Sequence, residues 1–263
     1  MFQQFLVTIK AANTRETYGR GLGYFADWAG DNGVDLTALR VRDIKAFRDF
    51  LGDRLGAAST NVYLSALRAF LRWAADEELI EPAVYQATTV VKNVKVPERL
   101  PQVLRAEEVT ELLCQPDPAT LSGARDLAFI AILVTSGIRV SEAAGLDLER
   151  IDIYNRTARV IGKGDKERVV RFTTKTAQAL AHYLQLRNNG ATTGPVFTNR
   201  SGTRISVRYM QERVGGYGFT LASGERLHPH TLRHTFATMY LDATGDIDGT
   251  RRWLGHESTA TTQ

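Results

Sequence analysis

The chain has 263 residues, a formal net charge of +4 and a pI of about 9.2, and its residues are 43% hydrophobic and 24% charged. This length and composition fit a globular protein of one large domain or two moderate ones, and they exclude low-complexity and fibrous classes. The longest apolar run, residues 127–134, is too short to cross a bilayer, and with a single cysteine (Cys114) and no signal-peptide pattern we expect a cytoplasmic protein without a membrane partner.

Residues 1–91 are predicted to form an all-α domain. Apolar side chains recur every three or four residues in stretches that start near Asn13, Val41 and Ser59, which is the pattern of amphipathic helices. Asn13 and Glu16 have the spacing of a capping box, so we expect a helix to begin there. The predicted core positions are Tyr18, Leu22, Phe25, Ala29, Ile44, Phe47, Leu51, Tyr63, Leu67, Phe70 and Ala74.

Arg68 and Arg72 lie one turn apart on the polar face of the helix predicted near Ser59. Taken alone, such a pair is typical of a solvated helix face. Arginine recurs along the whole chain, however, and its planar guanidinium suits two-pronged phosphate contacts better than the lysine ammonium does. The positive net charge therefore permits a polyanion partner without proving one.

Residues 92–104 separate the helical domain from the rest of the chain. They contain two prolines and several charges, with no helical period, and are predicted to be an extended linker. Residues 105–263 mix helical with strand patterns, so the expected fold class is mainly α with a small β-hairpin or sheet. Helices are predicted at 105–114, 123–134, 176–186 and 229–241, and hairpin strands at 158–161 and 167–172, on either side of a Gly-Lys-Gly-Asp turn.

The helix predicted at 229–241 has two different faces. Its apolar stripe lies opposite a face that carries His230, Arg233, His234 and the small Ala237, which leaves room for a ligand. Histidines four residues apart could also bind a metal ion, as in zinc proteases. A glutamate is absent after the first histidine, however, and a cationic arginine between the two repels a metal ion, so we expect no metal site.

Arg139 follows Gly137, which is predicted to end the buried helix, and Glu142 lies one turn further on. An arginine at the end of a rigid helix can be aimed at an anion with little loss of entropy, and Glu142 can hold its orientation. Lys163 lies between two glycines at the predicted hairpin tip, where it can swing. Taken alone, an Arg-Glu pair is typical of a surface ion pair, and Gly-Lys-Gly is typical of a solvated turn. A binding site for an anion is indicated only when these features occur together with the His-Arg helix.

These residues belong to four longer motifs. They are residues 135–142 (TSGIRVSE), 162–169 (GKGDKERV), 230–238 (HTLRHTFAT) and 254–256 (LGH). In order and spacing the motifs resemble those of the tyrosine recombinase or phage integrase family, and within it the Xer-type site-specific recombinases. The N-terminal helices resemble the family's core-binding domain, so the resemblance extends over essentially the whole chain. It implies a helical DNA-clamp domain at 1–91 and a catalytic domain at 105–263.

The resemblance implies a role for each motif residue. Arg139 and Arg233 resemble the two arginines that clamp the non-bridging oxygens of the scissile phosphate, where their charge matters most in the transition state. Glu142 resembles the acidic residue that supports the first arginine. Because fixed cations supply the charge that magnesium supplies in many nucleases, no metal or other cofactor is expected.

The remaining positions follow in the same way. His230 resembles the histidine that hydrogen-bonds the phosphate and assists proton movement, and Lys163 resembles the lysine that protonates the departing 5′-hydroxyl. His256 resembles the last phosphate contact. In this context Arg68 and Arg72 become candidate DNA contacts.

The family's nucleophile is a tyrosine that follows the Leu-Gly-His turn. The sequence ends at Gln263, so the resemblance places this tyrosine just beyond it, and residues 1–263 are expected to recognise the phosphate without cutting DNA. Tyr240 and Tyr217 belong to no motif and are expected to be structural. The family's terminal docking helix is also expected past Gln263, so assembly with other protomers, a tetramer on paired sites in the family, would be impaired.

Two main functions follow from these observations. The leading hypothesis is site-specific recombination of double-stranded DNA through a 3′-phosphotyrosyl intermediate. The alternative is a non-catalytic DNA-binding protein, a truncated recombinase that occupies or regulates a recombination site. A metal hydrolase built on the histidines is a third reading, and it would require bound zinc.

Overall fold

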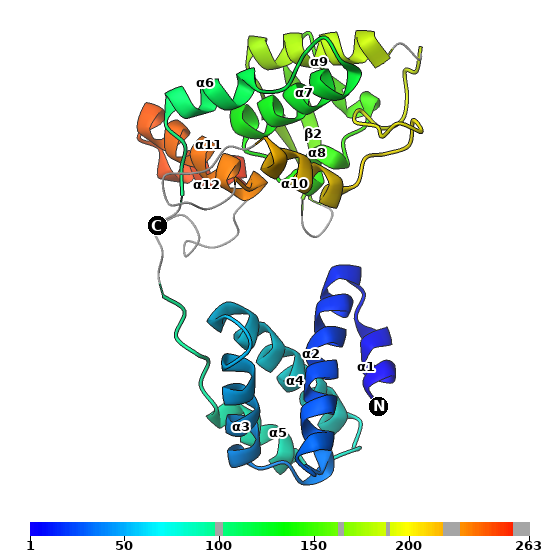
Figure 1. The fold of residues 1–263 in the computed structure, drawn as a ribbon, viewed down its shortest axis with the longest axis vertical. Helices are drawn as coiled ribbons and strands as arrows, with labels where there is room; N and C mark the ends of the chain where they lie inside the picture. Colours follow the sequence, from blue (N-terminus) through cyan, green and yellow to red (C-terminus); the bar gives the residue numbers. More distant parts are fainter. Residues whose placement is uncertain (98–101, 163–165, 188–189, 218–226, 255–263) are drawn as a thin grey trace. The chain divides into compact units, whose positions relative to one another are not determined.

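The computed structural model describes residues 1–97, 102–162, 166–187, 190–217 and 227–254 (Figure 1). The chain divides into two compact units, Met1–Arg99 and Leu100–Gln263. Both are mainly helical, and the second also has a three-stranded sheet, so the predicted fold class is confirmed. None of the helices in the described ranges combines enough length and apolarity to span a bilayer.

The first unit is built from helices alone. They are α1 (Phe2–Thr8), α2 (Ala12–Asp31), α3 (Val41–Gly52), α4 (Ala57–Asp76) and α5 (Pro82–Val90), with a 3₁₀ turn at Leu36–Ala38. The starts of the helices predicted near Val41 and Ser59 are confirmed to within two residues. The predicted capping box is wrong, because the N-cap of α2 is Ala11, without a side-chain hydrogen bond, and Glu16 pairs with Arg20 instead.

Aromatic side chains fill the core of the first unit. Phe25 and Phe47 are fully buried and meet edge to face, with ring centroids 5.1 Å apart. The helices α2 and α4 approach closely at Gly21, where a Cβ would lie 2.9 Å from Cδ1 of Tyr63. The predicted core positions are buried, except that Tyr18 and Tyr63 are half-buried.

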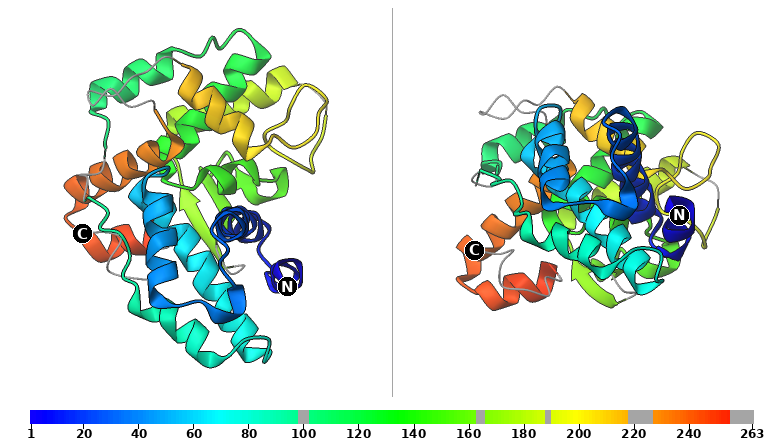
Figure 2. Two further views of the ribbon diagram at one scale, coloured as in Figure 1. Left: turned by 60° about the horizontal axis from the view of Figure 1, so that its bottom comes forward. Right: turned by 90° about the horizontal axis from the view of Figure 1, so that it is seen from below.

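The second unit is arranged around one central helix, α7 (Leu121–Ser136). The uniformly apolar run predicts a buried helix, and α7 packs against helices on several sides. Its helical neighbours are α6 (Ala106–Cys114), α8 (Val140–Ala144), α9 (Thr174–Arg187), α10 (Val207–Gly216) and α11 (Pro229–Thr244). A last helix, α12 (Ile247–Leu254), lies beside α11, as the orange and red ribbons of Figure 2 show.

The sheet has the order β1-β2-β3 and is antiparallel throughout. Its strands are β1 (Ile151–Asp152), β2 (Thr157–Ile161) and β3 (Glu167–Arg171). The predicted hairpin is therefore confirmed to within one residue at each end. Side chains alternate between the two faces, and Arg168 lies opposite the buried Val160, on the same face as the buried Val170. This arginine consequently points toward the interior of the unit.

Candidate functional site

The end of α7 determines where Arg139 lies. Gly137 terminates the helix in the left-handed conformation (φ 65°), and a Cβ there would lie 2.2 Å from Cδ1 of Phe236 on α11. Only glycine satisfies both the backbone angle and this close approach. The chain then turns into α8, whose N-cap is Arg139, and the side chain of Arg139 remains 36% exposed.

Glu142 holds Arg139 by two hydrogen bonds. The backbone N–H of Arg139 donates to Oε2 of Glu142 at 2.7 Å, and Nη1 donates to Oε1 at 3.0 Å. The structure therefore brings this predicted pair together. The first bond caps the short helix α8, and the second restricts the rotamer of the arginine.

Arg168 on β3 is a second partner of Glu142, and the motif analysis did not assign it a role. Its Nη1 and Nη2 donate to the two carboxylate oxygens at 2.8 and 2.9 Å, a bidentate pair. Burial by itself would raise the pKa of Glu142, but the hydrogen bonds from Arg168 and Arg139 outweigh it and leave that pKa below the usual range. Glu142 is thus an anion shared by two arginines.

Arg233 on α11 is buried, with 4% of its surface exposed. Its Nη1 donates to the carbonyl oxygen of Gly137 at 2.5 Å, and its Nη2 donates to that of Leu254 at 2.6 Å. Burial, followed by repulsion from Arg139, lowers the pKa of Arg233 to about 10. Two backbone carbonyls therefore orient this guanidinium, which forms no ion pair with a carboxylate among the described residues.

His230 begins the same helix, directly after Pro229 at its first position. Its ring meets that of His234 edge to face, with centroids 4.9 Å apart. Burial lowers the pKa of His230, and the charges of Arg233 and Arg139 lower it further. Burial also lowers the pKa of His234, with a smaller effect from His230. We therefore expect both rings to be neutral at pH 7 while no anion is bound.

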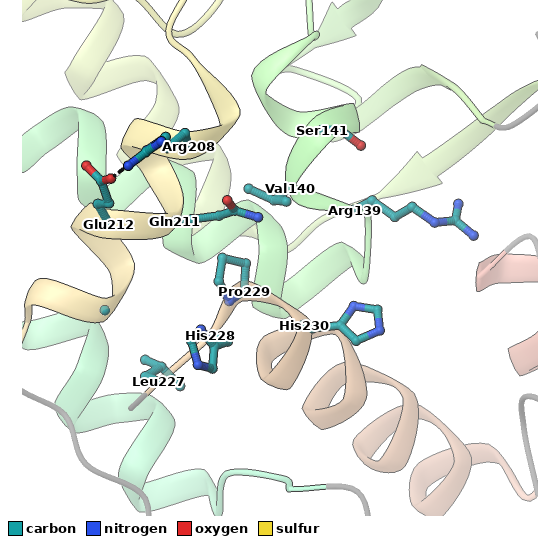
Figure 3. A pocket seen from close by; sticks show the side chains of 11 residues that line it. Arg139, Val140, Ser141, Arg208, Gln211, Glu212, Leu227, His228, Pro229 and His230 are labelled. Atoms are coloured by element: carbon teal, nitrogen blue, oxygen red, sulfur yellow. Dashed lines mark hydrogen bonds and ion pairs between the residues drawn. The ribbon is translucent and has the colours of Figure 1, made fainter. Parts of the chain in front are cut away.

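A pocket of about 780 Å³ opens beside this cluster, between α8, α10 and the start of α11. Figure 3 shows Arg139 and His230 pointing to the same side, away from α10. The opposite wall carries Arg208, Gln211 and Glu212, with Arg208 and Glu212 paired at 3.0 Å. Two of the predicted site residues, Arg139 and His230, thus line an open pocket.

The charges of this cluster do not balance. Within the described part of the chain, Arg139, Arg168 and Arg233 surround the single carboxylate of Glu142. Desolvated cations in excess are unfavourable unless an anion is bound, and planar guanidiniums match the oxygens of a phosphate. The arrangement can therefore bind a phosphate group and stabilise extra negative charge on it. In these same ranges, His, Cys, Asp and Glu side chains form no group of three or more that could hold a metal ion.

Two predicted site residues, Lys163 and His256, lie outside the described residues. The residues beside them are described. The backbone N–H of Gly162 donates to the carbonyl oxygen of Lys166 at 2.8 Å, which closes the base of the loop that carries Lys163. Leu254, which accepts from Arg233, ends α12 and stands two residues before His256.

The two candidate DNA-contact arginines differ in their surroundings. Arg68 is engaged within its own unit, because its guanidinium donates to the carbonyl oxygens of Thr88 and Val91 and to Oδ1 of Asn93. Burial also lowers its pKa. The side chain of Arg72 is 70% exposed, and its one ion-pair contact within the described ranges is a long one, 3.9 Å to Asp76. A DNA contact stays a prediction for both, with Arg72 the freer of the two.

Tyr217 and Tyr240, the two tyrosines expected to be structural, both have partners within the fold. Tyr217 donates its hydroxyl hydrogen to Oδ2 of the buried Asp126 at 2.6 Å, and burial together with this bond raises the pKa of the phenol. A raised pKa is the opposite of what an attacking phenolate requires. Tyr240 stacks on Phe236 and lies 5.6 Å from the ring of Trp253.

Sequence reasoning also missed the network around Asp126. This fully buried carboxylate accepts from Arg125, Arg213 and Tyr217, and thereby ties α10 to the start of α7. The available signal was an Arg-Asp pair inside an otherwise apolar helix. A charged pair at such positions predicts buried partners elsewhere in the fold.

The comparisons with known proteins agree with these features. The model of the phage integrase family matches residues 102–263, and that of the N-terminal SAM-like domain of phage integrases matches residues 1–78. The tyrosine recombinase XerC of Actinobacillus pleuropneumoniae is 36% identical over 258 residues, which are 95% of this chain and 82% of the relative.

Solved structures share the fold. The XerH site-specific recombinase bound to palindromic difH substrate, a post-cleavage complex, matches with a TM-score of 0.78 at 24% identity, over 94% of this chain and 74% of that one. A lambda integrase tetramer bound to a Holliday junction matches with a TM-score of 0.73 at 16% identity, over 100% and 78% of the two chains.

Proposed function

This chain belongs to the phage integrase family of tyrosine recombinases, and we propose that its cationic cluster holds the scissile phosphate of DNA during site-specific recombination. The observation that carries the proposal is the excess of guanidinium groups over carboxylates around Arg233. The partners are double-stranded DNA and, as in the tetramer of lambda integrase, other recombinase protomers.

The two clamp arginines would act mainly in the transition state. When an oxygen attacks phosphorus in line, the non-bridging oxygens gain negative charge, and donors already in place stabilise that charge without reorganising. Arg233 is fixed by the carbonyls of Gly137 and Leu254, and Arg139 is fixed by Glu142. Both guanidiniums keep further N–H groups for the phosphate, since each carries five donors.

The proposed reaction is an exchange of phosphodiester bonds. The oxygen of a tyrosine attacks phosphorus, the bond between phosphorus and the 5′ oxygen breaks, and a 3′-phosphotyrosyl bond forms. The leaving 5′ oxygen takes a proton from Lys163, and the tyrosine proton leaves with the help of His230. Because its pKa is lowered, neutral His230 can accept that proton near pH 7. His256 would contact the phosphate from the segment after α12.

In the family the attacking tyrosine belongs to the segment that follows the Leu-Gly-His turn, and we propose the same origin for the nucleophile here. Tyr217 and Tyr240 remain structural in this proposal, since one donates to Asp126 and the other stacks on Phe236. The fixed cations provide the charge stabilisation, so we propose no metal cofactor.

We propose that residues 1–91 form the domain that clamps DNA, residues 92–104 the linker, and residues 105–263 the catalytic domain. Contacts with the DNA backbone would make affinity fall steeply with salt. Since the substrate is DNA, we place the activity in the cytoplasm, with the chromosome.

A nicked suicide substrate tests the proposal. In such DNA the strand beyond the cleavage point diffuses away, so the phosphotyrosyl adduct accumulates and is seen as a shift in denaturing electrophoresis. We expect an adduct from residues 1–263 extended with the corresponding segment of the A. pleuropneumoniae relative, here called the extended chain, and none when the tyrosine of that segment is replaced by phenylalanine. Specific DNA binding without an adduct from the extended chain would instead support the alternative, a protein that occupies or regulates a recombination site.

A further inference from the structure

Arg168 connects three elements of the proposed active site. It lies on β3, the strand that follows the loop carrying Lys163. Its two terminal nitrogens bind Glu142 of α8 at 2.8 and 2.9 Å, and its Nε donates to the carbonyl oxygen of Trp253, in the last turn of α12, at 3.2 Å. One side chain thereby joins the hairpin, the helix that begins at Arg139, and the helix that precedes His256.

The chemistry of this connection requires arginine. The side chain of Arg168 is 17% exposed and that of Glu142 is 3% exposed, so water screens the pair weakly. A planar guanidinium can grip both carboxylate oxygens and still use Nε for a third acceptor. A lysine ammonium keeps the charge but cannot reproduce this geometry.

The ion pair between Arg168 and Glu142 also lies next to Gly162, the last described residue before Lys163. A Cβ on Gly162 would stand 3.4 Å from Nη1 of Arg168 and 3.8 Å from Oε1 of Glu142. The Gly162 backbone closes the loop through its hydrogen bond to Lys166. The position at which the loop leaves the sheet is therefore fixed against the carboxylate that also holds Arg139.

We infer that Arg168 is a positioning residue for the leaving-group proton transfer: through the shared Glu142 it fixes Gly162, the residue before Lys163, relative to Arg139. Arg168 does not itself touch the phosphate in this scheme. The inference rests on the proposed function, because it presumes that Lys163 protonates the 5′ oxygen. It adds the contacts that hold the described residue before Lys163 beside the clamp.

The test separates this role from a general effect on stability by changing the leaving group. A substrate with sulfur in place of the bridging 5′ oxygen expels a thiolate, whose much lower proton affinity removes the need for an acid. In the extended chain, with saturating DNA, Arg168→Lys should cleave the oxygen substrate about 100-fold more slowly than the parent, the scale of a lost general acid. Cleavage of the sulfur substrate should fall less than about 5-fold, since only the proton transfer is disturbed.

Two control variants are compared with Arg168→Lys, and a third replaces it if it does not fold. Lys163→Ala should show the same dependence on the leaving group, because it removes the acid itself. Arg171→Lys, an equivalent change at an exposed position of the same strand, should leave both rates close to those of the parent. If Arg168→Lys does not fold, Gly162→Val places its bulk against the ion pair without removing either charge, and should slow only the oxygen substrate.

Each outcome decides something different. Equal losses on both substrates would overturn the inference, because Arg168 would then act on the clamp or on the fold as a whole. Failure of the parent chain to cleave either substrate would instead count against the proposed function.

Discussion

Arg233 and Leu254 are joined by a 2.6 Å hydrogen bond from Nη2 of the arginine to the last carbonyl oxygen of α12. The residue that we expect to clamp the phosphate thus also holds the helix from which the chain continues toward His256. The bond caps a carbonyl oxygen at the C-terminal end of the helix, and it uses one of the five donors of the arginine. The proposed phosphate binding and the position of α12 are therefore coupled through this one side chain.

The first prediction concerns that guanidinium. In the extended chain, Arg233→Ala should lower the single-turnover cleavage rate at least about 1000-fold, because it removes charge stabilisation from the transition state. Specific DNA binding should stay within about 5-fold of the parent, because many other phosphate contacts remain. Arg105→Ala serves as the control, at an arginine whose side chain is 77% exposed and pairs with Glu108. Comparable cleavage by the Arg233 variant would refute its assigned role.

The second prediction is a dependence of stability on pH. Burial lowers the pKa of His230 in the fold, whereas in the unfolded chain it should titrate near the ordinary value of about 6.5. Below that pH, His230 binds a proton more readily in the unfolded chain than in the folded one. The free energy of unfolding should therefore decrease as the pH falls through 6.5, and it should be constant above that pH. Urea unfolding at a series of pH values measures this change.

The His230→Gln variant should show a smaller decrease over the same range, while the exposed His182→Gln should behave like the parent. An unchanged pH dependence in His230→Gln would show that the buried imidazole is not responsible. Bound DNA should weaken the effect, since a phosphate partly offsets the influence of burial, so DNA binding below pH 6.5 should take up protons while His230 stays neutral at pH 7.

Much of the fold follows from local sequence patterns. The apolar run of α7 and the alternation around the Gly-Lys-Gly turn predict the central helix and the hairpin, because each pattern has the period of the element that it forms. The helix α12 was missed, since it is short and depends on tertiary contacts, among them the hydrogen bond from Trp253 Nε1 to the carbonyl oxygen of Ser136.

The site was predictable in part for the same reason. Arg139 and Glu142 lie three residues apart, so sequence spacing shows that they can meet. Arg168 reaches Glu142 from 26 positions along the chain, and the tertiary packing of the sheet against α8 brings the two together. Arg68 illustrates the reverse case. Its helical face suggests a solvent-exposed cation, but the returning segment at Val91 supplies acceptors that spacing alone does not reveal.

The third prediction isolates the close approach at Gly137. Gly137 and Gly245 both end helices in the left-handed region, at φ 65° and 64°, but only Gly137 has a neighbour in the space of a Cβ. Gly245→Ala should lower the free energy of unfolding by about 1 kcal/mol, the cost of the backbone angle. Gly137→Ala should cost a further ~1–3 kcal/mol, because the methyl group overlaps the ring of Phe236. If chemical denaturation shows the same loss of unfolding free energy for both variants, α11 must shift at little cost to make room for the methyl group.

The fourth prediction separates the two arginines of α4. Arg68→Ala should lower the free energy of unfolding by about 1–3 kcal/mol, because three acceptors lose a charged donor. Arg72→Ala should leave stability within about 0.5 kcal/mol, as an exposed residue with a long ion-pair contact. If Arg72 contacts a DNA phosphate, its removal should also reduce the slope of log affinity against log salt by about 1. An unchanged salt slope in Arg72→Ala would exclude that contact. If Arg68→Ala keeps the free energy of unfolding of the parent, the hydrogen bonds to Thr88, Val91 and Asn93 do not stabilise the first unit.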